Sequence, residues 1–284
     1  MSSVTRAQAR SILTATSGFL QEGFTHTLNP YSGCAFGQNT RGGQGCPFCY
    51  VRRSPAGLFG PAPWGEWVTV KTNAPELLAK ELRSLRRRGK PIRIFMSSST
   101  DPFQPVERTE QISRRCLEVM VDTPPDHLVV QTRSLLVRAC FPLLARLPAL
   151  LSISLETNRE DVRKLFTPTS PPVAARLKLA HRAREHGIPV QVAVSPVLPY
   201  DPGTFAGLLA DCADRVVVDT LFDGDGARGA RSESLGMREL FARHGLGDWY
   251  RRDAHLPLLA ALRSRMGEER VLYSCEGFNT LPPG

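Results

Sequence analysis

The sequence has no long apolar segment. No run in its 284 residues reaches the roughly eighteen consecutive apolar residues that a membrane-spanning helix needs. Its first residues contain no long apolar stretch followed by a cleavage site, so we expect neither membrane association nor secretion. The six histidines form no H-x-x-x-H or H-E-x-x-H pattern, which argues against a hydrolytic zinc site. The motifs of a phosphate-binding loop and of a serine nucleophile elbow are also absent.

The composition favours a globular protein of the cytoplasm. Hydrophobic residues make up 42% of the chain and charged residues 22%, which is ordinary for a soluble domain. The seven cysteines are an odd number in a long chain without a signal peptide, so we expect reduced thiols rather than disulfides. The formal net charge of +9 favours a polyanionic partner such as nucleic acid, although arginine-rich proteins are often basic without binding one.

Strand-like segments alternate with helical segments along most of the chain. The predicted strands span residues 24–28, 64–71, 92–96, 128–131, 150–155, 189–194 and 215–219, with a last one near 271–274. The predicted helices span residues 6–14, 74–88, 107–121, 138–146, 171–186, 204–212, 233–244 and 256–266. This alternation predicts about six β/α units and a parallel sheet. We divide the chain into an N-terminal leader (1–24), a core (25–220) and a C-terminal extension (221–284).

Three of the seven cysteines lie in the loop from Leu28 to Pro55. Cys46 and Cys49 form a C-x-x-C pair, and Cys34 lies eleven intervening residues upstream. Three thiolates from one loop suit a metal or an iron–sulfur cluster better than a disulfide pattern. The spacing alone leaves structural zinc and an iron–sulfur cluster about equally open, since C-x-x-C serves both. Because no fourth cysteine follows nearby, the set would leave one coordination position free for a ligand.

The same loop resembles the cluster loop of radical S-adenosylmethionine (radical SAM) enzymes. The similarity is carried by Asn29-Pro30-Tyr31, Gly33-Cys34 and Cys46-Pro47-Phe48-Cys49-Tyr50. The nearest branch includes spore photoproduct lyase and "DNA repair photolyase"-like proteins, whose loop reads N-P-Y-x-G-C-x-x-x-C-x-Φ-C-Y, with Φ aromatic. Here the first gap has eleven residues instead of three, and the added length contains Gly37, Gly42, Gly43 and Gly45. Further similar blocks occur at residues 71–74, 99–105, 152–157 and 195–199.

The resemblance implies a fold, two cofactors and a set of site residues. The implied fold is a partial (β/α)6 TIM-like barrel, here with a C-terminal extension. Cys34, Cys46 and Cys49 would bind a [4Fe–4S] cluster whose fourth iron binds S-adenosyl-L-methionine. Residues implied to contact S-adenosylmethionine follow the predicted strands or the cysteines: Phe48, Tyr50, Ser98, Ser99, Thr100, Asp101, Glu156, Asn158 and Ser195.

Several of these residues can also be explained without a role in cofactor binding. Ser, Thr, Asp and Asn are also favoured as helix caps, and this applies to Ser98–Asp101 and to Asn158. Gln131–Arg133 and Asp219 also follow predicted strands, where the working groups of parallel α/β barrels lie. Cys275 is a speculative hydrogen donor, since a free cysteine is more often a small buried apolar residue.

The implied activity is radical chemistry on a substrate that the sequence leaves open. The enzyme would cleave S-adenosylmethionine to a 5′-deoxyadenosyl radical that abstracts a substrate hydrogen. Our first hypothesis for the substrate is a DNA pyrimidine lesion, as for spore photoproduct lyase; the alternative is radical tailoring of a peptide, natural product or small metabolite. A non-catalytic, zinc-stapled nucleic-acid-binding protein is the alternative from another class. We expect a reductant such as flavodoxin or ferredoxin, no membrane partner and a cytoplasmic location.

Overall fold

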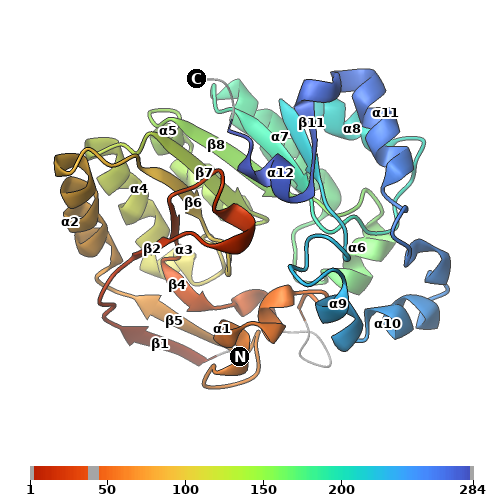
Figure 1. The fold of residues 1–284 in the computed structure, drawn as a ribbon, viewed down its shortest axis with the longest axis horizontal. Helices are drawn as coiled ribbons and strands as arrows, with labels where there is room; N and C mark the ends of the chain where they lie inside the picture. The colour runs from red at the N-terminus through yellow and green to blue at the C-terminus, as the bar shows by residue number, and fades with distance from the viewer. Residues whose placement is uncertain (1–2, 38–44, 282–284) are drawn as a thin grey trace.

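The computed structural model describes residues 3–37 and 45–281, and in this part of the chain the strands form two sheets (Figure 1). The larger sheet has the strand order β11-β10-β9-β8-β7-β6-β3-β2. Its parallel strands are β3 (His26–Leu28), β6 (Arg93–Met96), β7 (His127–Thr132), β8 (Ala149–Ser154), β9 (Val190–Val194), β10 (Arg215–Val218) and β11 (Val271–Tyr273). Only its edge strand β2 (Leu13–Ala15) runs antiparallel to its neighbour.

The six predicted β/α units correspond to β3 and β6 to β10, so the predicted parallel sheet is confirmed. The described strands form an open sheet and not a closed barrel, as the term partial barrel implies. The segment 221–284, which we separated as an extension, supplies β11, which pairs with β10 from Val216↔Val271 to Val218↔Tyr273. The proposed division into three domains remains a prediction.

The smaller sheet joins the first residues of the chain to the cysteine loop. Strand β5 (Trp67–Lys71) pairs in parallel with β1 (Ser3–Ala7) and antiparallel with β4 (Tyr31–Gly33). The helix predicted over residues 6–14 is therefore wrong, because this segment forms β1 and β2 instead. Local helix propensity is a weak preference, and pairing with a neighbouring strand overrides it here.

The helices follow the strands and cover the sheet, with α2, α4 and α5 on one side of the view in Figure 1 and α7, α8 and α11 on the other. They are α1 (Pro55–Leu58), α2 (Ala74–Arg87), α3 (Glu107–Glu110), α4 (Ile112–Asp122), α5 (Phe141–Leu144), α6 (Glu160–Phe166), α7 (Val173–Glu185), α8 (Phe205–Cys212), α9 (Ala230–Ser234), α10 (Met237–Arg243), α11 (Leu256–Met266) and α12 (Ser274–Asn279). Among the described residues, no helix combines the length and apolarity that crossing a membrane requires.

The helix predicted over residues 107–121 is interrupted at Gln111, whose backbone is left-handed with φ +52°. A buried carboxylate explains why a new helix begins there. Glu107 accepts hydrogen bonds from the backbone N–H groups of Ser113 (3.0 Å) and Arg114 (2.9 Å), and from the hydroxyl of Tyr31. The N–H groups at a helix start have no partner within the helix, so this carboxylate stabilises the start of α4.

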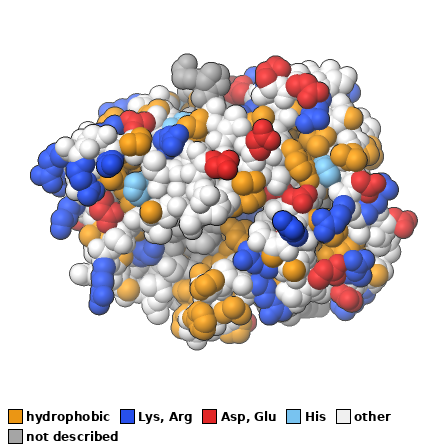
Figure 2. Space-filling model, viewed as in Figure 1, with side chains coloured by type: hydrophobic (Ala, Val, Ile, Leu, Met, Phe, Trp, Pro, Cys, Tyr) orange, Lys and Arg blue, Asp and Glu red, His pale blue; other side chains and the backbone are white. Residues whose placement is uncertain are grey.

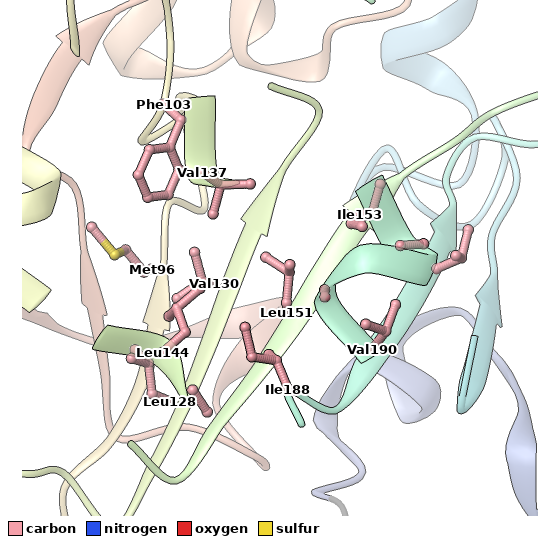
Figure 3. Close-up of a cluster of buried hydrophobic side chains, with 14 of the residues drawn as sticks. Met96, Phe103, Leu128, Val130, Val137, Leu144, Leu151, Ile153, Ile188 and Val190 are labelled. Atoms are coloured by element: carbon pink, nitrogen blue, oxygen red, sulfur yellow. The ribbon is translucent and has the colours of Figure 1, made fainter. Parts of the chain in front are cut away.

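The two faces of the larger sheet have separate apolar cores. On the outer face, side chains of the strands pack against the helices, and Figure 3 shows Leu128, Val130, Leu151 and Ile153 among them. On the inner face, other residues of the same strands form a smaller apolar cluster with Phe24, which precedes β3, and Phe278 of α12; the strand residues are Phe95, Val129, Leu150, Ala193 and Val217. Since successive side chains of a strand point to opposite faces, both cores follow from alternation within single strands.

We expect Leu151→Ala to lower the free energy of unfolding by about 2–5 kcal/mol, because it removes a fully buried side chain from the centre of the outer core. Leu58→Ala is the matched control: Leu58 is 57% exposed, and its loss should change stability by less than about 0.5 kcal/mol. Urea unfolding of both variants measures the difference. Equal effects of the two substitutions would contradict the assignment of this core.

Candidate active site

Two adjoining cavities lie where the parallel strands end. The first, which we call the cysteine cavity, encloses about 990 Å³, part of it open to solvent, and is lined by Cys34, Cys46 and Cys49. The second cavity comprises about 1150 Å³, part of which is also open to solvent. The two share Tyr50, the serines 97–99, Gln131 and Ser195 as lining residues. Because the two cavities share these residues, a ligand bound in one of them would lie next to the other.

Alternation along the strands also decides which polar groups reach these cavities. Phe95, Val129, Leu150, Ala193 and Val217 point to the inner face of the sheet. Two or four residues further along the same strands, the same face carries polar side chains that line one or both cavities: Ser97, Gln131, Arg133, Ser154, Ser195 and Asp219. The inner face thus changes from apolar to polar toward the carboxyl ends of the strands, where parallel barrels hold their functional groups.

Cys34 is positioned by the end of strand β4. Gly33, just before it, has φ +80°, and a Cβ at this position would lie 2.3 Å from the carbonyl oxygen of Trp67. Only glycine can therefore occupy this close turn. The hydroxyl of Thr100 donates to the Gly33 carbonyl (2.6 Å), and Gln104 accepts from the N–H of Ala35 (2.8 Å). These contacts join the first cysteine to the loop that follows β6.

Cys46 and Cys49 are held in a tight turn, in which the N–H of Cys49 donates to the Cys46 carbonyl (3.1 Å). Phe48, between them, is buried in an apolar cluster with Val162, Phe166 and Phe222 and also lines the cysteine cavity. The Tyr50 hydroxyl donates to the carbonyl of Ser98 (2.5 Å). The two aromatic residues of the predicted motif therefore anchor the cysteine pair to its surroundings. Residues 38–44, which include Gly42 and Gly43 of the predicted insertion, lie outside the described residues.

The three cysteines are half-buried, and the loss of solvent changes the acidity of the Cys34 and Cys46 thiols. Burial raises the pKa of Cys34 well above its ordinary value, and the neighbouring Cys46 and Cys49 thiols raise it further. For Cys46, burial raises the pKa to about 11, although the cationic Arg133 acts in the opposite direction. A metal must therefore displace the thiol protons on binding, as thiolate ligation requires.

The donor set fits an iron–sulfur cluster. Within residues 3–37 and 45–281 no three His, Cys, Asp or Glu side chains are grouped for a single metal ion. A [4Fe–4S] cluster makes a different demand, because each cysteine binds its own iron. Three thiols around one cavity, from a single loop, fit this demand, and in such a cluster one iron would remain without a cysteine ligand.

The polar segment after β6 lines the cysteine cavity through Ser97, Ser98, Ser99, Thr100 and Asp101. Its serines are tied to the sequence N-P-Y, since the side-chain oxygen of Asn29 accepts from the Ser99 hydroxyl (3.2 Å). The Ser97 hydroxyl is buried and has no hydrogen-bond partner among the described residues.

Asp101 is engaged within the protein, because its carboxylate accepts from Phe103 N–H (2.8 Å), Thr132 Oγ1 (2.7 Å) and Arg133 N–H (2.9 Å). Burial raises the pKa of this carboxyl, while these hydrogen bonds lower it. The carboxylate therefore fixes the ends of β6 and β7 relative to each other.

Glu156 lies behind the cavity wall between two arginines. Its carboxylate pairs with Arg133 (3.2 Å) and with Arg176 (2.8 Å), and the side chains of Glu156 and Arg176 have no exposed surface. Burial opposes ionisation of Glu156, but Arg133 and Arg176 outweigh it and lower its pKa. Arg133, which we noted in the sequence only as a strand-end residue, lines the cysteine cavity and also contacts Cys46.

Besides Glu156, two further predicted site residues lie outside the described linings of the two cavities. Asn158 donates to Thr204 Oγ1 (2.8 Å) and accepts from the N–H of Asp201 (2.8 Å), and so fastens the loop before α8. Cys275 lies in α12 and donates to the carbonyl of Phe19 (3.1 Å). Their predicted roles in S-adenosylmethionine binding and hydrogen donation stay predictions.

Asp219, at the end of β10, is buried beside the second cavity. Its Oδ1 accepts from the N–H of Thr220 (2.8 Å). Gly224 packs so closely that a Cβ there would lie 2.1 Å from Asp219 Oδ2. Burial raises the pKa of Asp219 to about 7, with the nearby Asp223 acting in the same direction.

This raised pKa predicts a pH-dependent effect of Asp219→Asn. A carboxyl whose pKa is raised by folding stabilises the folded state below its unfolded pKa, and this stabilisation is lost as the pH rises through about 7. Between about pH 5 and about pH 8, the free energy of unfolding of the unsubstituted protein should therefore fall by about 2–3 kcal/mol relative to that of Asp219→Asn. Urea unfolding of both proteins across this range is the measurement. A difference in stability that does not change with pH would contradict the assignment.

Known proteins are similar to this chain in sequence and in fold. A sequence model of the radical SAM superfamily matches residues 28–210. "Uncharacterized protein ORF301" of Acidianus two-tailed virus is 32% identical over 163 residues, which are 54% of this chain and 52% of that protein. "Uncharacterized protein MJ0683" of Methanocaldococcus jannaschii is 26% identical over 178 residues, which are 62% of each chain. The chain thus matches between about half and three fifths of the length of these relatives.

The fold is similar to that of spore photoproduct lyase. The structure of this lyase complexed with dinucleoside spore photoproduct has a TM-score of 0.63 at 14% identity, and covers 95% of this chain and 81% of that one. A point mutant of the lyase gives a TM-score of 0.64 at 12% identity with the same coverage. At this level of identity the comparison shows a shared fold.

Proposed function

The chain belongs to the radical SAM superfamily, and from this premise we propose that Cys34, Cys46 and Cys49 bind a [4Fe–4S] cluster with one iron open to S-adenosylmethionine. The observation that carries the proposal is that all three thiols line one cavity at the carboxyl ends of the parallel strands. When bound and reduced, such a cluster supplies the electron that cleaves S-adenosylmethionine into methionine and a 5′-deoxyadenosyl radical, which abstracts a hydrogen from the substrate.

The residues of the chain would bind and orient S-adenosylmethionine. The small hydroxyl side chains Ser98, Ser99 and Thr100 line the cysteine cavity and can hydrogen-bond the amino and carboxylate groups of the methionine moiety. Phe48 and Tyr50 line the same cavity and offer flat apolar surface to the adenine. Ser195 lines both cavities and so would lie between cofactor and substrate. Glu156 acts through Arg133, because its own carboxylate lies behind the cavity wall.

We propose that the substrate is a pyrimidine lesion in DNA and that the reaction is of the spore photoproduct lyase type. Three observations support this: the shared fold with that lyase, the net charge of +9, and a second cavity that adjoins the cysteine cavity. Figure 2 shows Lys and Arg side chains gathered over α2 on the face in view. Part of this charge has a structural partner, since Arg86 pairs with Asp126 at 2.5 Å. We further propose a cytoplasmic location and a flavodoxin or ferredoxin as reductant.

The experiment has two separate readings. Anaerobically reconstituted protein, given dithionite and S-adenosylmethionine, should form 5′-deoxyadenosine. If no 5′-deoxyadenosine is formed, the proposed radical reaction is contradicted. Binding to duplex DNA containing a thymine lesion should weaken steeply with salt, because phosphate contacts release counterions. Formation of 5′-deoxyadenosine without any salt-dependent DNA binding would favour radical tailoring of a peptide, natural product or small metabolite.

A further inference from the structure

The three cysteines of the loop are not equivalent in their surroundings. Arg133 Nη1 lies 3.0 Å from the Sγ of Cys46 and donates to it. Among the hydrogen bonds of the described residues, Cys46 is the one cysteine of the three whose sulfur accepts from a charged side chain. The Arg133 side chain is only 17% exposed, so water screens this contact weakly.

The guanidinium of Arg133 is fixed from several sides. Its Nη1 also lies 3.3 Å from Ser170 Oγ, and its Nη2 lies 3.2 Å from Glu156 Oε1. Glu156 is in turn held by Arg176, whose Nη1 donates to Glu156 Oε2 (2.8 Å) and to the carbonyl of Ser154 (2.7 Å). Arg176, Glu156 and Arg133 therefore form a chain of polar contacts that ends at the sulfur of Cys46. The carboxylate of Asp101, which also lies nearby, accepts from the backbone N–H of Arg133.

The free-energy cost of burying these charges indicates that the charge of Arg133 serves a function. Arg176 and Glu156 are fully buried, and placing charges in the interior is unfavourable even when they are paired. The backbone N–H of Arg133 and the packing of β7 would be served equally by an uncharged residue. What the charge adds is a cationic hydrogen-bond donor, held in one orientation against Cys46.

We propose that Arg133 raises the reduction potential of the cluster by hydrogen-bonding the sulfur of Cys46, and that Glu156 and Arg176 act through Arg133 as positioning residues. The inference rests on the proposed function, since it requires the cluster. Reduction adds one electron to the cluster and its thiolates, and a fixed cation beside one sulfur stabilises the reduced form more than the oxidised form. Hydrogen bonds to the sulfurs are among the factors that set iron–sulfur potentials.

The test is a potentiometric titration of the reconstituted cluster in the absence of S-adenosylmethionine, with the reduced cluster detected by electron paramagnetic resonance. In Arg133→Met the ratio of reduced to oxidised cluster at a fixed potential should fall about tenfold, a shift of about 59 mV to lower potential for a one-electron couple. Arg133→Lys keeps the positive charge but loses the planar fork, so it should restore part of the shift. The control is Arg215→Met, because Arg215 is also buried on the inner face but donates to Gln191 (2.6 Å) and not to a cysteine.

The outcomes separate this inference from the proposed function. Protein that holds no cluster in the parent form would contradict the proposed function itself. A parent cluster whose potential is the same in Arg133→Met overturns the inference alone, as does an equal shift in Arg215→Met. If the potential is unchanged but S-adenosylmethionine binds more weakly to Arg133→Met, Arg133 binds that ligand instead of tuning the cluster, and the inference is also overturned.

Discussion

Substituting alanine for any one of Cys34, Cys46 and Cys49 should abolish both cluster binding and 5′-deoxyadenosine formation. Each cysteine would bind a separate iron, so the loss of one thiolate leaves a corner of the cluster exposed. The three residues line a single cavity, and the sequence from Leu28 to Pro55 contains no other Cys, and no His, Asp or Glu, that could replace a missing ligand. Anaerobic reconstitution, with iron and sulfide determination and chromatography of the nucleoside product, measures both effects.

The control for this prediction is Cys212→Ala. Cys212 is a fully buried free cysteine at the end of α8, and its sulfur contacts the carbonyl of Leu209 (3.7 Å) in the last turn of this helix. Removing it should cost some stability but leave iron content and product formation within about twofold of the parent. A cysteine-loop variant that keeps its cluster and activity would remove that residue from the ligand set, and an effect of Cys212→Ala as large as the others would point to general unfolding.

We expect Arg176→Met to destabilise the protein by about 3–5 kcal/mol, because it leaves Glu156 buried with one counter-charge where there were two. For a chain of 284 residues this corresponds to a melting temperature lower by about 6–10 °C. Thermal unfolding of the protein without cluster, monitored by circular dichroism, measures this decrease in stability.

Arg184→Met provides the comparison on the same helix. Arg184 pairs with Asp214 at 3.0 Å, but both side chains are more than a third exposed, so this pair should contribute less than about 1 kcal/mol. In the double variant Arg176→Met with Glu156→Gln, the total loss should be smaller than the sum of the single losses, since the two residues act on each other. An effect of Arg176→Met no larger than that of Arg184→Met would contradict the account of the buried charges.

The fold was predictable from the sequence because its strands have strong local patterns. β8 (Ala149–Ser154) is buried along its whole length and is apolar except for Ser152 and Ser154, and α2 carries Leu78, Leu82 and Leu85 at helical spacing. The first residues gave no such pattern, because β1 is exposed throughout and depends on its pairing with β5. The break at Gln111 depends on Glu107 folding back onto the next helix, which no short-range pattern indicates.

The cysteines were the most predictable part of the site, since three soft donors in one loop restrict the chemistry by themselves. Gln131 and Arg133 were noted as strand-end residues, and the cavity residues Ser97 and Ser154 could have been found by continuing the inward alternation of β6 and β8 past their apolar part. The contact between Arg133 and Cys46 joins residues 87 positions apart and depends on the tertiary structure. The hydrogen bonds of Asn158 likewise depend on the loop around Asp201.

The central claim is that three thiolates hold an iron–sulfur cluster and leave one iron open. Mössbauer spectroscopy of protein reconstituted with ⁵⁷Fe tests it most directly, with and without S-adenosylmethionine. We predict about four irons for each chain, with the spectrum of one in four changing when S-adenosylmethionine is added. A single zinc without sulfide, or a cluster in which no iron responds to S-adenosylmethionine, would contradict the account.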